Sequence, residues 1–445
     1  MRWTIGGLVL AVSLWTSIGT AQTNFTASDP GVRIEVGSSG GPLSGLTKRQ
    51  LAFFNAGKDA FQGIEGVADG LGPRFNLTIC GGCHAQPTTG GTSPAHNPQA
   101  DIPQQFPNNT LPSFISVDGP VREARFKRLA NGAPDGGVHD LFVIDCGITQ
   151  EDYEAQLAQN NVIFRIPTPV FGSGLIEAIP DSVIVANAQA TMGTKEALGV
   201  RGRVNRQRIS GDFNRNGNDG TIARFGWKAQ NKSLLLYTGE AYNVEMGITN
   251  ELFQTEREEA PACQFKSVPN SVTDTEQMDL ITGLSDMEKF AFFMRLLAPP
   301  MPSLDQPGGA TSLARGRTLF GTAGCALCHA PTLQTGNSPI AAIANQPVNL
   351  FSDLLLHNIG IGLADGISQG EAGPDEFRTA PLWGLGQRIF LLHDGRTTEL
   401  LEAIQAHSGQ GSFFTQPSEA NAVIANFNQL AEGQKQDLLN FLRSL

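Results

Sequence analysis

Two cysteine motifs are the residues of this sequence best suited to chemistry. Residues 80–84 and 325–329 both have the spacing C-x-x-C-H, and their cysteines and histidines are Cys80, Cys83, His84, Cys325, Cys328 and His329. This spacing is typical of c-type haem attachment, because two thiols add to the vinyl groups on one porphyrin edge and the adjacent histidine binds the iron. A zinc site would need two more ligands for each pair, and no second C-x-x-C or H-x-x-x-H lies nearby. The motifs therefore predict two covalently bound haems.

The ligand on the opposite face of each iron decides what that haem does. A second strong ligand gives an electron-transfer haem, whereas an open face allows oxygen or peroxide chemistry. The sequence contains no methionine and no tyrosine after residue 301. A distal ligand for the second haem that comes from its own domain must therefore be one of three histidines, His357, His393 or His407.

The distal ligand of the first haem is left open by the sequence. His96 follows His84 closely, in a loop that Pro94 and Pro98 stiffen, so its reach over the ring is short. His139 lies far enough along the chain to reach the iron and is the candidate ligand. Its alternative role is that of an ordinary surface or core histidine.

Length and composition predict a globular protein with more than one domain and short elements. The chain has 445 residues, of which 40% are hydrophobic and 16% charged, so it can fill sizeable cores. Its 51 glycines and 26 prolines favour loops. We expect a mainly α fold with many loops and a few short strands. The net charge of −11 disfavours binding to nucleic acid, because phosphate neutralisation needs a basic surface.

The first 21 residues predict an export signal. Arg2 precedes an apolar run over residues 5–15, and the small residues Gly19 and Ala21 suit cleavage after Ala21. A membrane anchor is the alternative, but the run is shorter than the ~20 residues that span a bilayer. We therefore expect a periplasmic protein with no membrane span after signal cleavage.

Export to an oxidising compartment permits disulfides. Cys146 and Cys263 have no second cysteine or histidine at ligand spacing. We therefore predict a disulfide between these two cysteines, with two unrelated buried thiols as the alternative.

Breaks in the pattern divide the chain after the signal into three parts. Residues 22–45 are polar and glycine-rich and predict a flexible segment. Residues 46–298 are expected to form an N-terminal haem domain with a large insertion of loops, helices and strands, among them a strand over residues 162–166. Residues 299–445 are expected to form a C-terminal cytochrome c-like haem domain, which begins after a helix over residues 285–297 with capping-box spacing at its start.

One loop partly matches a calcium site. Asp212, Asn214, Asn216 and Gly217 have the order of a calcium-binding loop, but Ala223 stands where that loop needs a bidentate glutamate. A polar hairpin turn is the favoured interpretation, and bound calcium is the alternative.

Most of the mature chain resembles a family of haem proteins. The motifs that carry the likeness lie at residues 377–384, 392–396 and 400–407, with further matches at 353–360, 363–366, 441–445, 172–181 and 224–229. They are similar to those of bacterial di-haem cytochrome c peroxidases and more closely to those of the di-haem oxidoreductases, also called thiol-oxidoreductase-like proteins. The resemblance implies an electron-transfer haem in the C-terminal domain and a peroxidatic haem in the N-terminal domain.

The resemblance also implies ligands for the C-terminal haem. In the peroxidases the distal methionine lies fourteen residues after the histidine of an H-D-G motif, and fourteen residues after His393 stands His407. The likeness therefore implies a haem with two histidine ligands, His329 and His407, and a lower potential than a methionine ligand gives. The alternative role of His407 is that of a surface helix residue. His393, beside Asp394, is expected to contact the haem or a ligand rather than the iron.

An acid–base residue and an electron relay at the first haem are implied as well. In the peroxidases a glutamate before a methionine moves the peroxide proton, and a tryptophan upstream of it lies between the haems. Glu245, before Met246, and Trp227 look like this arrangement. A structural salt bridge and a core aromatic residue are their alternative roles. The distal glutamine of the peroxidases has no clear counterpart, since leucines occupy residues 234–236.

These features together predict an exported di-haem c-type oxidoreductase. We expect the C-terminal haem to relay electrons to a peroxidase-like N-terminal haem, with an electron-donor protein or a small redox substrate as partner. The alternatives are a non-catalytic di-haem electron carrier and an accessory protein in iron handling. In the electron carrier a second ligand would bind the iron of the N-terminal haem, whereas in the oxidoreductase that position would be open.

Overall fold

The computed structural model describes residues 25–34, 39–206, 222–254, 260–263, 282–413 and 415–445. The predicted export signal and residues 212–217 of the partial calcium match lie outside these ranges. Within the described ranges helices predominate, and the strands are two to four residues long. This arrangement confirms the expected mainly α fold with a few short strands. No helix of the described residues is long and apolar enough to cross a membrane.

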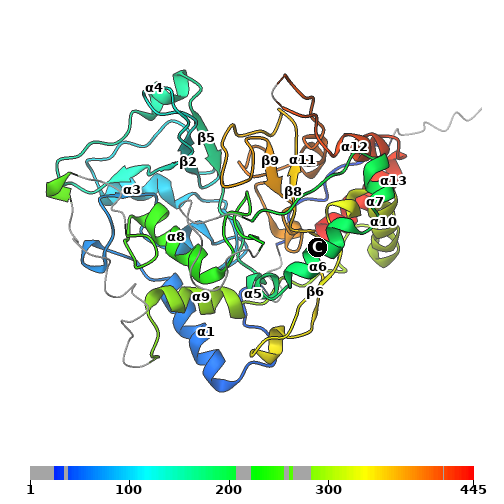
Figure 1. The fold of residues 1–445 in the computed structure, drawn as a ribbon, viewed down its shortest axis with the longest axis horizontal. Coiled ribbons are helices and arrows are strands. Elements are labelled where there is room, and N and C mark those ends of the chain that lie inside the picture. The colour runs from blue at the N-terminus through cyan, green and yellow to red at the C-terminus, as the bar shows by residue number, and fades with distance from the viewer. Residues whose placement is uncertain (1–24, 35–38, 207–221, 255–259, 264–281, 414) are drawn as a thin grey trace, which may run out of the picture.

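Three helices form a cluster at the lower left of the molecule (Figure 1). They are α1 (Lys48–Phe61), α8 (Leu234–Met246) and α9 (Asp286–Leu296). Helix α9 begins where predicted, because Ser285 and Glu288 form a reciprocal capping box that satisfies backbone N–H groups of the first turn. Thr47 and Gln50 cap α1 in the same way.

The close packing of α1 on α9 depends on one glycine. A Cβ at Gly57 would lie 2.2 Å from the backbone oxygen of Lys289, so no larger residue fits at this crossing. Beside it, Phe54 and Phe293 pack with their ring centres 5.5 Å apart. These aromatic contacts stabilise the pairing of α1, which precedes the N-terminal cysteine motif in sequence, with α9.

Short strands form the upper left of the molecule (Figure 1). The strands β3 (Val138–His139), β2 (Glu123–Phe126) and β5 (Val162–Arg165) make an antiparallel sheet in that order, and β1 (Arg74–Phe75) pairs with β4 (Phe142–Val143). The strand predicted over residues 162–166 is therefore confirmed. Because Glu123 lies opposite Arg165 in the register, β2 and β5 bring charged residues together at one end of the sheet.

The C-terminal part contains a second helix pair, α10 (Gly309–Ala323) and α13 (Glu432–Ser444), on the right of Figure 1. The same part also contains α11 (Leu400–Gln405), α12 (Asn421–Asn428) and two strand pairs, β6 (Leu333–Gln334) with β7 (Pro347–Val348) and β8 (Leu356–Asn358) with β9 (Glu376–Arg378). Helices α10 and α13 approach closely at Gly316, where a Cβ would lie 2.0 Å from the Asp437 backbone oxygen. Both cysteine motifs thus follow a helix that packs on its partner through a glycine.

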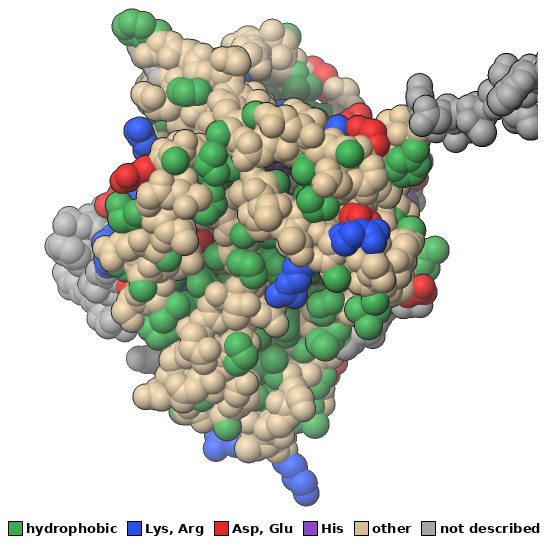
Figure 2. Space-filling model, turned by 90° about the vertical axis from the view of Figure 1, so that its right-hand side faces the viewer, with side chains coloured by type: hydrophobic (Ala, Val, Ile, Leu, Met, Phe, Trp, Pro, Cys, Tyr) green, Lys and Arg blue, Asp and Glu red, His purple; other side chains and the backbone are tan. Residues whose placement is uncertain are grey.

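The remaining described elements are short. They are the α-helices α2 (Cys80–Cys83), α3 (Ile102–Gln105), α4 (Tyr153–Ala158), α5 (Ser173–Glu177), α6 (Asp181–Gln189) and α7 (Met192–Ala197), and the 3₁₀ turns η1 (Val67–Asp69), η2 (Pro98–Asp101), η3 (Pro261–Cys263), η5 (Cys325–Leu327), η6 (Ala341–Ile343) and η7 (Leu385–Gln387). The face seen in Figure 2, which is the right-hand side of Figure 1, shows apolar side chains with few charged ones among them.

The segment predicted to be flexible, residues 22–45, is anchored where the structure describes it. Asp29 forms a buried ion pair with Arg443 of α13 over 2.6 Å. The Arg33 guanidinium donates to the Leu445 carbonyl over 2.9 Å. Polar and glycine-rich composition suggested flexibility, but these long-range contacts fix residues 25–34 against the C-terminal helix.

The predicted disulfide is confirmed. Cys146 and Cys263 are bonded, with Cα atoms 5.3 Å apart and 117 residues between them in sequence. The bridge ties the loop after β4 to the short η3 turn. The four cysteines of the C-x-x-C-H motifs are free thiols.

Candidate functional site

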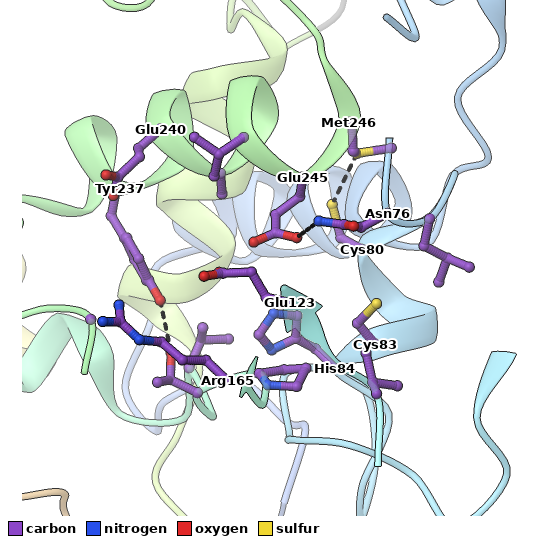
Figure 3. Close-up of a pocket in the computed structure, with 18 of the residues that line it drawn as sticks. Asn76, Cys80, Cys83, His84, Glu123, Arg165, Tyr237, Glu240, Glu245 and Met246 are labelled. Atoms are coloured by element: carbon purple, nitrogen blue, oxygen red, sulfur yellow. Dashed lines mark hydrogen bonds between the residues drawn. The ribbon is translucent and has the colours of Figure 1, made fainter. Parts of the chain in front are cut away.

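The first cavity is built around the N-terminal cysteine motif. It encloses about 1180 Å³ of empty space beside Cys80, Cys83 and His84 (Figure 3). The two cysteines lie three positions apart on α2, so they share one face of that turn. With its proton on Nδ1, His84 donates to the Gly91 carbonyl over 3.0 Å, which leaves Nε2 free to bind a metal. Burial lowers the pKa of His84 and so favours the neutral imidazole that metals bind.

Carboxyl groups reach into the same cavity. Glu245 comes from the last turn of α8 and Glu123 from β2, and Figure 3 shows their carboxyl groups close to one another. The two groups are close enough for each to affect the pKa of the other. The Asn76 side chain donates a hydrogen bond to Glu245 over 2.9 Å. The predicted acid–base residue is therefore placed on the cavity wall, with a partner that the sequence did not reveal.

The two carboxyl groups differ in their electrostatic surroundings. Burial, and then the negative charge of Glu123, raise the pKa of Glu245 well above its usual range. Burial alone would raise the pKa of Glu123 too, but Arg125 and Arg165 outweigh it and lower that pKa. These shifts favour the protonated form of Glu245 and the ionised form of Glu123.

His139 does not reach the first cavity. Its Nε2 lies 2.8 Å from a carboxylate oxygen of Asp135, and its ring stacks on Phe126 with the ring centres 3.6 Å apart. The pairing of β3 with β2 holds it there, on the far side of the sheet from the cysteine motif, and the prediction of His139 as distal ligand is not supported. Among the described residues that line the cavity, His84 is the only histidine.

His96 and Met246 do not face His84 across the cavity either. The His96 ring pairs with Asp101 over 2.9 Å and is exposed. Met246 lines the cavity, but its sulfur lies 3.9 Å from the Cys80 sulfur, on the cysteine side (Figure 3). The face opposite His84 is thus bordered by carboxyl groups.

The second cavity is built around the C-terminal cysteine motif. It encloses about 1590 Å³ of empty space and is lined by Cys325, Cys328 and His329. Helix α10 ends at Gly324, whose φ of +102° suits glycine, and the η5 turn then presents the cysteines. His407, which follows α11, lines the same cavity.

His329 and His407 are arranged as a pair of ligands. With protons on Nδ1, His329 donates to the Phe351 carbonyl over 3.0 Å and His407 to the Ala403 carbonyl over 2.7 Å, so both Nε2 atoms are free. The ring centres lie 6.5 Å apart. Two imidazoles on opposite sides of one iron have ring centres about 6 Å apart, since metal–imidazole bonds are about 2 Å long. These residues fit a haem iron with two histidine ligands.

The other two histidines of this cavity have different roles. The ring nitrogens of His357 pair with Asp353 over 2.9 Å and with Glu419 over 2.7 Å, so neither is free for a metal. His393 lies against Phe377 with ring centres 4.3 Å apart. Burial lowers the pKa of His393 to about 4, and its neutral ring lines the cavity as a contact, in keeping with the role expected for it.

Trp227 borders both cavities. Its side chain is among the linings of the first and the second, and its Nε1 donates to the Ile166 carbonyl over 2.9 Å. The indole also lies beside His393, with ring centres 6.3 Å apart. The position between the cavities is the one that the family resemblance implied for a relay residue.

The first cavity contains buried polar atoms that lack a partner. Nε of Arg122 and of Arg165, and Oε1 of Gln230, are buried without a hydrogen bond, and all three side chains line the cavity. A buried donor without an acceptor costs about 1–3 kcal/mol. A haem fits this lining, because its propionate groups would supply acceptors to the two guanidinium groups.

Two arginines line the second cavity, the buried Arg378 and the half-buried Arg388. Within the described part of the chain neither forms an ion pair, and they donate hydrogen bonds to the backbone carbonyls of Gly226, Thr379, Pro381 and Trp383. Burial lowers the pKa of each to about 10. A haem with two carboxylates fits this cavity too, since it would neutralise both cations.

Sequence reasoning missed Glu123 and the four cavity arginines. For three of them the sequence offers one clue, a charged residue at the end of a short strand. Glu123 begins β2, Arg165 ends β5 and Arg378 ends β9. A charged residue in a half-buried strand usually faces solvent. Only the folded arrangement reveals that these side chains face a cavity.

The chain belongs to the di-haem oxidoreductase family. The model of that family matches residues 145–445, about two thirds of the chain, and this range includes the second cysteine motif, Trp227, Glu245 and His407. Membership implies two haems in the protein. The first cysteine motif lies before the matched range. No curated protein matches the chain.

Solved structures give distant similarities. The diheme peroxidase BthA from Burkholderia thailandensis is 14% identical, with a TM-score of 0.30, 50% of this chain covered and 65% of that one. A MauG-like protein associated with microbial copper homeostasis is 17% identical, with a TM-score of 0.30 and coverages of 63% and 90%. Hydrazine synthase from Kuenenia stuttgartiensis is 19% identical, with a TM-score of 0.24 and coverages of 36% and 55%. The chain thus spans about half to two thirds of the length of two of these proteins.

Proposed function

We propose that the protein is an exported di-haem c-type oxidoreductase that reduces peroxide. Cys80 and Cys83 would attach one haem covalently, and Cys325 and Cys328 the other. Electrons would pass from the C-terminal to the N-terminal cavity and on to the peroxide.

One observation carries this proposal: the two cavities differ in what faces the histidine of each motif. In the second cavity His407 faces His329, with ring centres 6.5 Å apart. In the first, the described lining has no histidine besides His84 and contains the carboxyl groups of Glu123 and Glu245. Two histidine ligands suit electron transfer, and an open face beside an acid suits peroxide chemistry.

When bound in these cavities, the haems supply iron that exchanges single electrons and, where one face is open, binds peroxide. The side chains of the chain do the rest. His84 and His329 would hold the iron through Nε2, and the carbonyl groups of Gly91 and Phe351 orient their rings. Glu245 moves a proton between the two peroxide oxygens, which is the transfer that O–O cleavage needs.

Trp227 is proposed as the connection between the cavities. Its indole borders both, and the hydrogen bond to Ile166 holds the ring in one orientation. The reducing partner is proposed to be an electron-donor protein or a small redox molecule. Export to the periplasm agrees with the disulfide between Cys146 and Cys263.

The test uses the holoprotein with both haems, reduced by one electron, and stopped-flow mixing with hydrogen peroxide. We expect oxidation of the reduced haem at a rate that depends on peroxide concentration. Glu245→Gln should slow that reaction about a hundredfold, within the range that general acid–base catalysis contributes. A holoprotein whose spectrum does not respond to peroxide would favour the non-catalytic electron carrier.

A further inference from the structure

Two half-buried glutamates meet in the first cavity, and only one of them was suggested by the family resemblance. Glu123 extends from β2 and Glu245 from the end of α8, so the pair joins the sheet to the helix cluster. Both side chains line the cavity, and their carboxyl groups lie close to one another (Figure 3). Two carboxylates in contact cannot both be ionised at low cost, so one proton must lie between them.

We propose that Glu123 and Glu245 share one proton and act together as the acid–base pair of the peroxide reaction. The inference rests on the proposed function and adds a second catalytic residue to it. Glu123 is the member that accepts a proton, and Glu245 is the member that donates one.

The surrounding groups favour this division. Glu123 forms an ion pair with Arg125 on the same strand, and Arg165 of β5 adds a second positive charge nearby. Arg125 is itself fixed by a hydrogen bond to the Gly136 carbonyl over 2.8 Å. These cations stabilise the charged form of Glu123, which lowers its pKa.

Among the described residues, no cation is a leading influence on Glu245, and Arg125 interacts more strongly with Glu123 than with Glu245. Its neighbours are the Asn76 amide, the Glu123 carboxylate and Asp140. Burial is the largest cause of its raised pKa, and the two acids raise that pKa further. Glu240, a third acid on the cavity wall, bonds to Asn231. Asn76 is held in turn, because its oxygen accepts the Leu141 N–H over 2.9 Å. The proton of the pair therefore lies on Glu245, and its carboxyl group is fixed in position.

The pair balances the proton transfers of the reaction. Glu123 takes the proton of one peroxide oxygen, and Glu245 gives its proton to the other oxygen. The O–O bond breaks as that oxygen leaves as water, and the pair again holds one proton. Two electrons from the electron-donor partner and two protons from solvent convert the remaining oxygen to the second water. A single glutamate would have to carry out both transfers in turn.

The first experiment locates the proton without using activity. Infrared spectra of the oxidised holoprotein, recorded against pH in H₂O and D₂O, report the C=O stretch of protonated buried carboxyl groups. We expect a band at neutral pH that is absent from Glu245→Gln. In Glu123→Gln the same band should disappear at lower pH than in the unmodified protein, because the negative charge that held the proton on Glu245 is gone.

Glu240→Gln is the matched control, because it removes a buried carboxyl group from the same cavity without touching the pair. It should leave the Glu245 band unchanged. A neutral-pH spectrum of Glu245→Gln that is identical to that of the unmodified protein, or a midpoint in Glu123→Gln equal to that of the unmodified protein, would overturn the shared proton.

The second experiment separates this inference from the proposed function. Glu123→Gln and Glu245→Gln should each slow the peroxide reaction about a hundredfold, and the double variant should be little slower than either. Independent, multiplying effects would contradict joint action. If peroxide does not react with the unmodified protein while the infrared result holds, the peroxidase proposal fails and the proton-sharing pair stands. If peroxide reacts and Glu123→Gln is without effect, the second catalytic residue is refuted and the peroxidase proposal stands.

Discussion

At the scale of single residues, a few side chains decide which chemistry each cavity can carry out. His407 follows a helix of only six residues, and the Ala403 carbonyl orients its ring toward His329. The family resemblance implied this role from the spacing to His393, and the geometry agrees with a ligand. His139 shows the limit of such reasoning. Reach along the chain suggested a ligand, but strand pairing and Asp135 hold the ring elsewhere.

A substitution at His407 tests the ligand directly. His407→Met should produce the sulfur-to-iron charge-transfer band of a haem with histidine and methionine ligands, and should raise the midpoint potential of that haem. Optical spectra and a redox titration of the holoprotein measure both. His357→Met is a control at a histidine of the same cavity whose nitrogens are occupied by carboxylates, and it should give no such band. An unchanged spectrum of His407→Met would mean that another residue binds the iron.

At the scale of elements, two glycines allow the helix crossings that carry the cysteine motifs. The sequence did not predict these crossings, because a glycine inside a helical pattern looks like a defect until the partner helix is placed. Gly316 faces the backbone of α13, whereas Gly321, on the same helix, has nothing near its Cβ position.

This difference predicts opposite effects of one substitution at two sites of α10. Gly316→Ala should lower the free energy of unfolding by about 1–3 kcal/mol, because the added methyl group forces the helices apart. Gly321→Ala should raise it by about 0.5–1 kcal/mol, because alanine is the better helix former and the site has room. Urea unfolding of both variants measures the changes. A loss of stability at Gly321, or none at Gly316, would contradict the packing described.

At the scale of the whole molecule, contacts far apart in sequence hold the two ends together and place Trp227 between the cavities. Composition predicted mobility for residues 22–45, because sequence shows neither the partner of Asp29 nor its burial. The resemblance to the peroxidases suggested roles for Trp227 and Glu245, because both residues match positions of the peroxidase motifs. They did not predict Glu123, Arg378 or Arg388, whose roles depend on which cavity each short strand borders.

The Asp29–Arg443 pair should make stability depend on pH. Its partners hold the pKa of Asp29 below the usual value, although burial opposes this shift. The pair therefore stabilises the fold above the unfolded-state pKa of ~3.9, and this contribution is lost as pH falls through the folded-state pKa. Asp29→Asn should cost about 3 kcal/mol at pH 7 and progressively less in acid. Urea unfolding against pH measures the difference, with the exposed Asp118→Asn as a control expected to show none.

The variant Trp227→Phe should distinguish a packing role of this side chain from a role in electron transfer. Phenylalanine keeps an aromatic ring between the cavities but loses the indole and its hydrogen bond to Ile166. We expect the reduced C-terminal haem to deliver its electron about tenfold more slowly after peroxide is added, a change of ~1.4 kcal/mol in barrier. Stopped-flow spectra of the half-reduced protein measure the rate. Trp383→Phe, at a buried tryptophan outside the first and second cavities, should leave it unchanged.

The central claim is that the two irons have different surroundings, one open and one closed by His407. An electron paramagnetic resonance spectrum of the fully oxidised holoprotein at neutral pH tests it most directly. The account predicts two signals of equal amount, a low-spin iron with two histidine ligands and a high-spin iron, and the low-spin signal alone should change in His407→Met. Two low-spin irons that are both unaffected by hydrogen peroxide would contradict it.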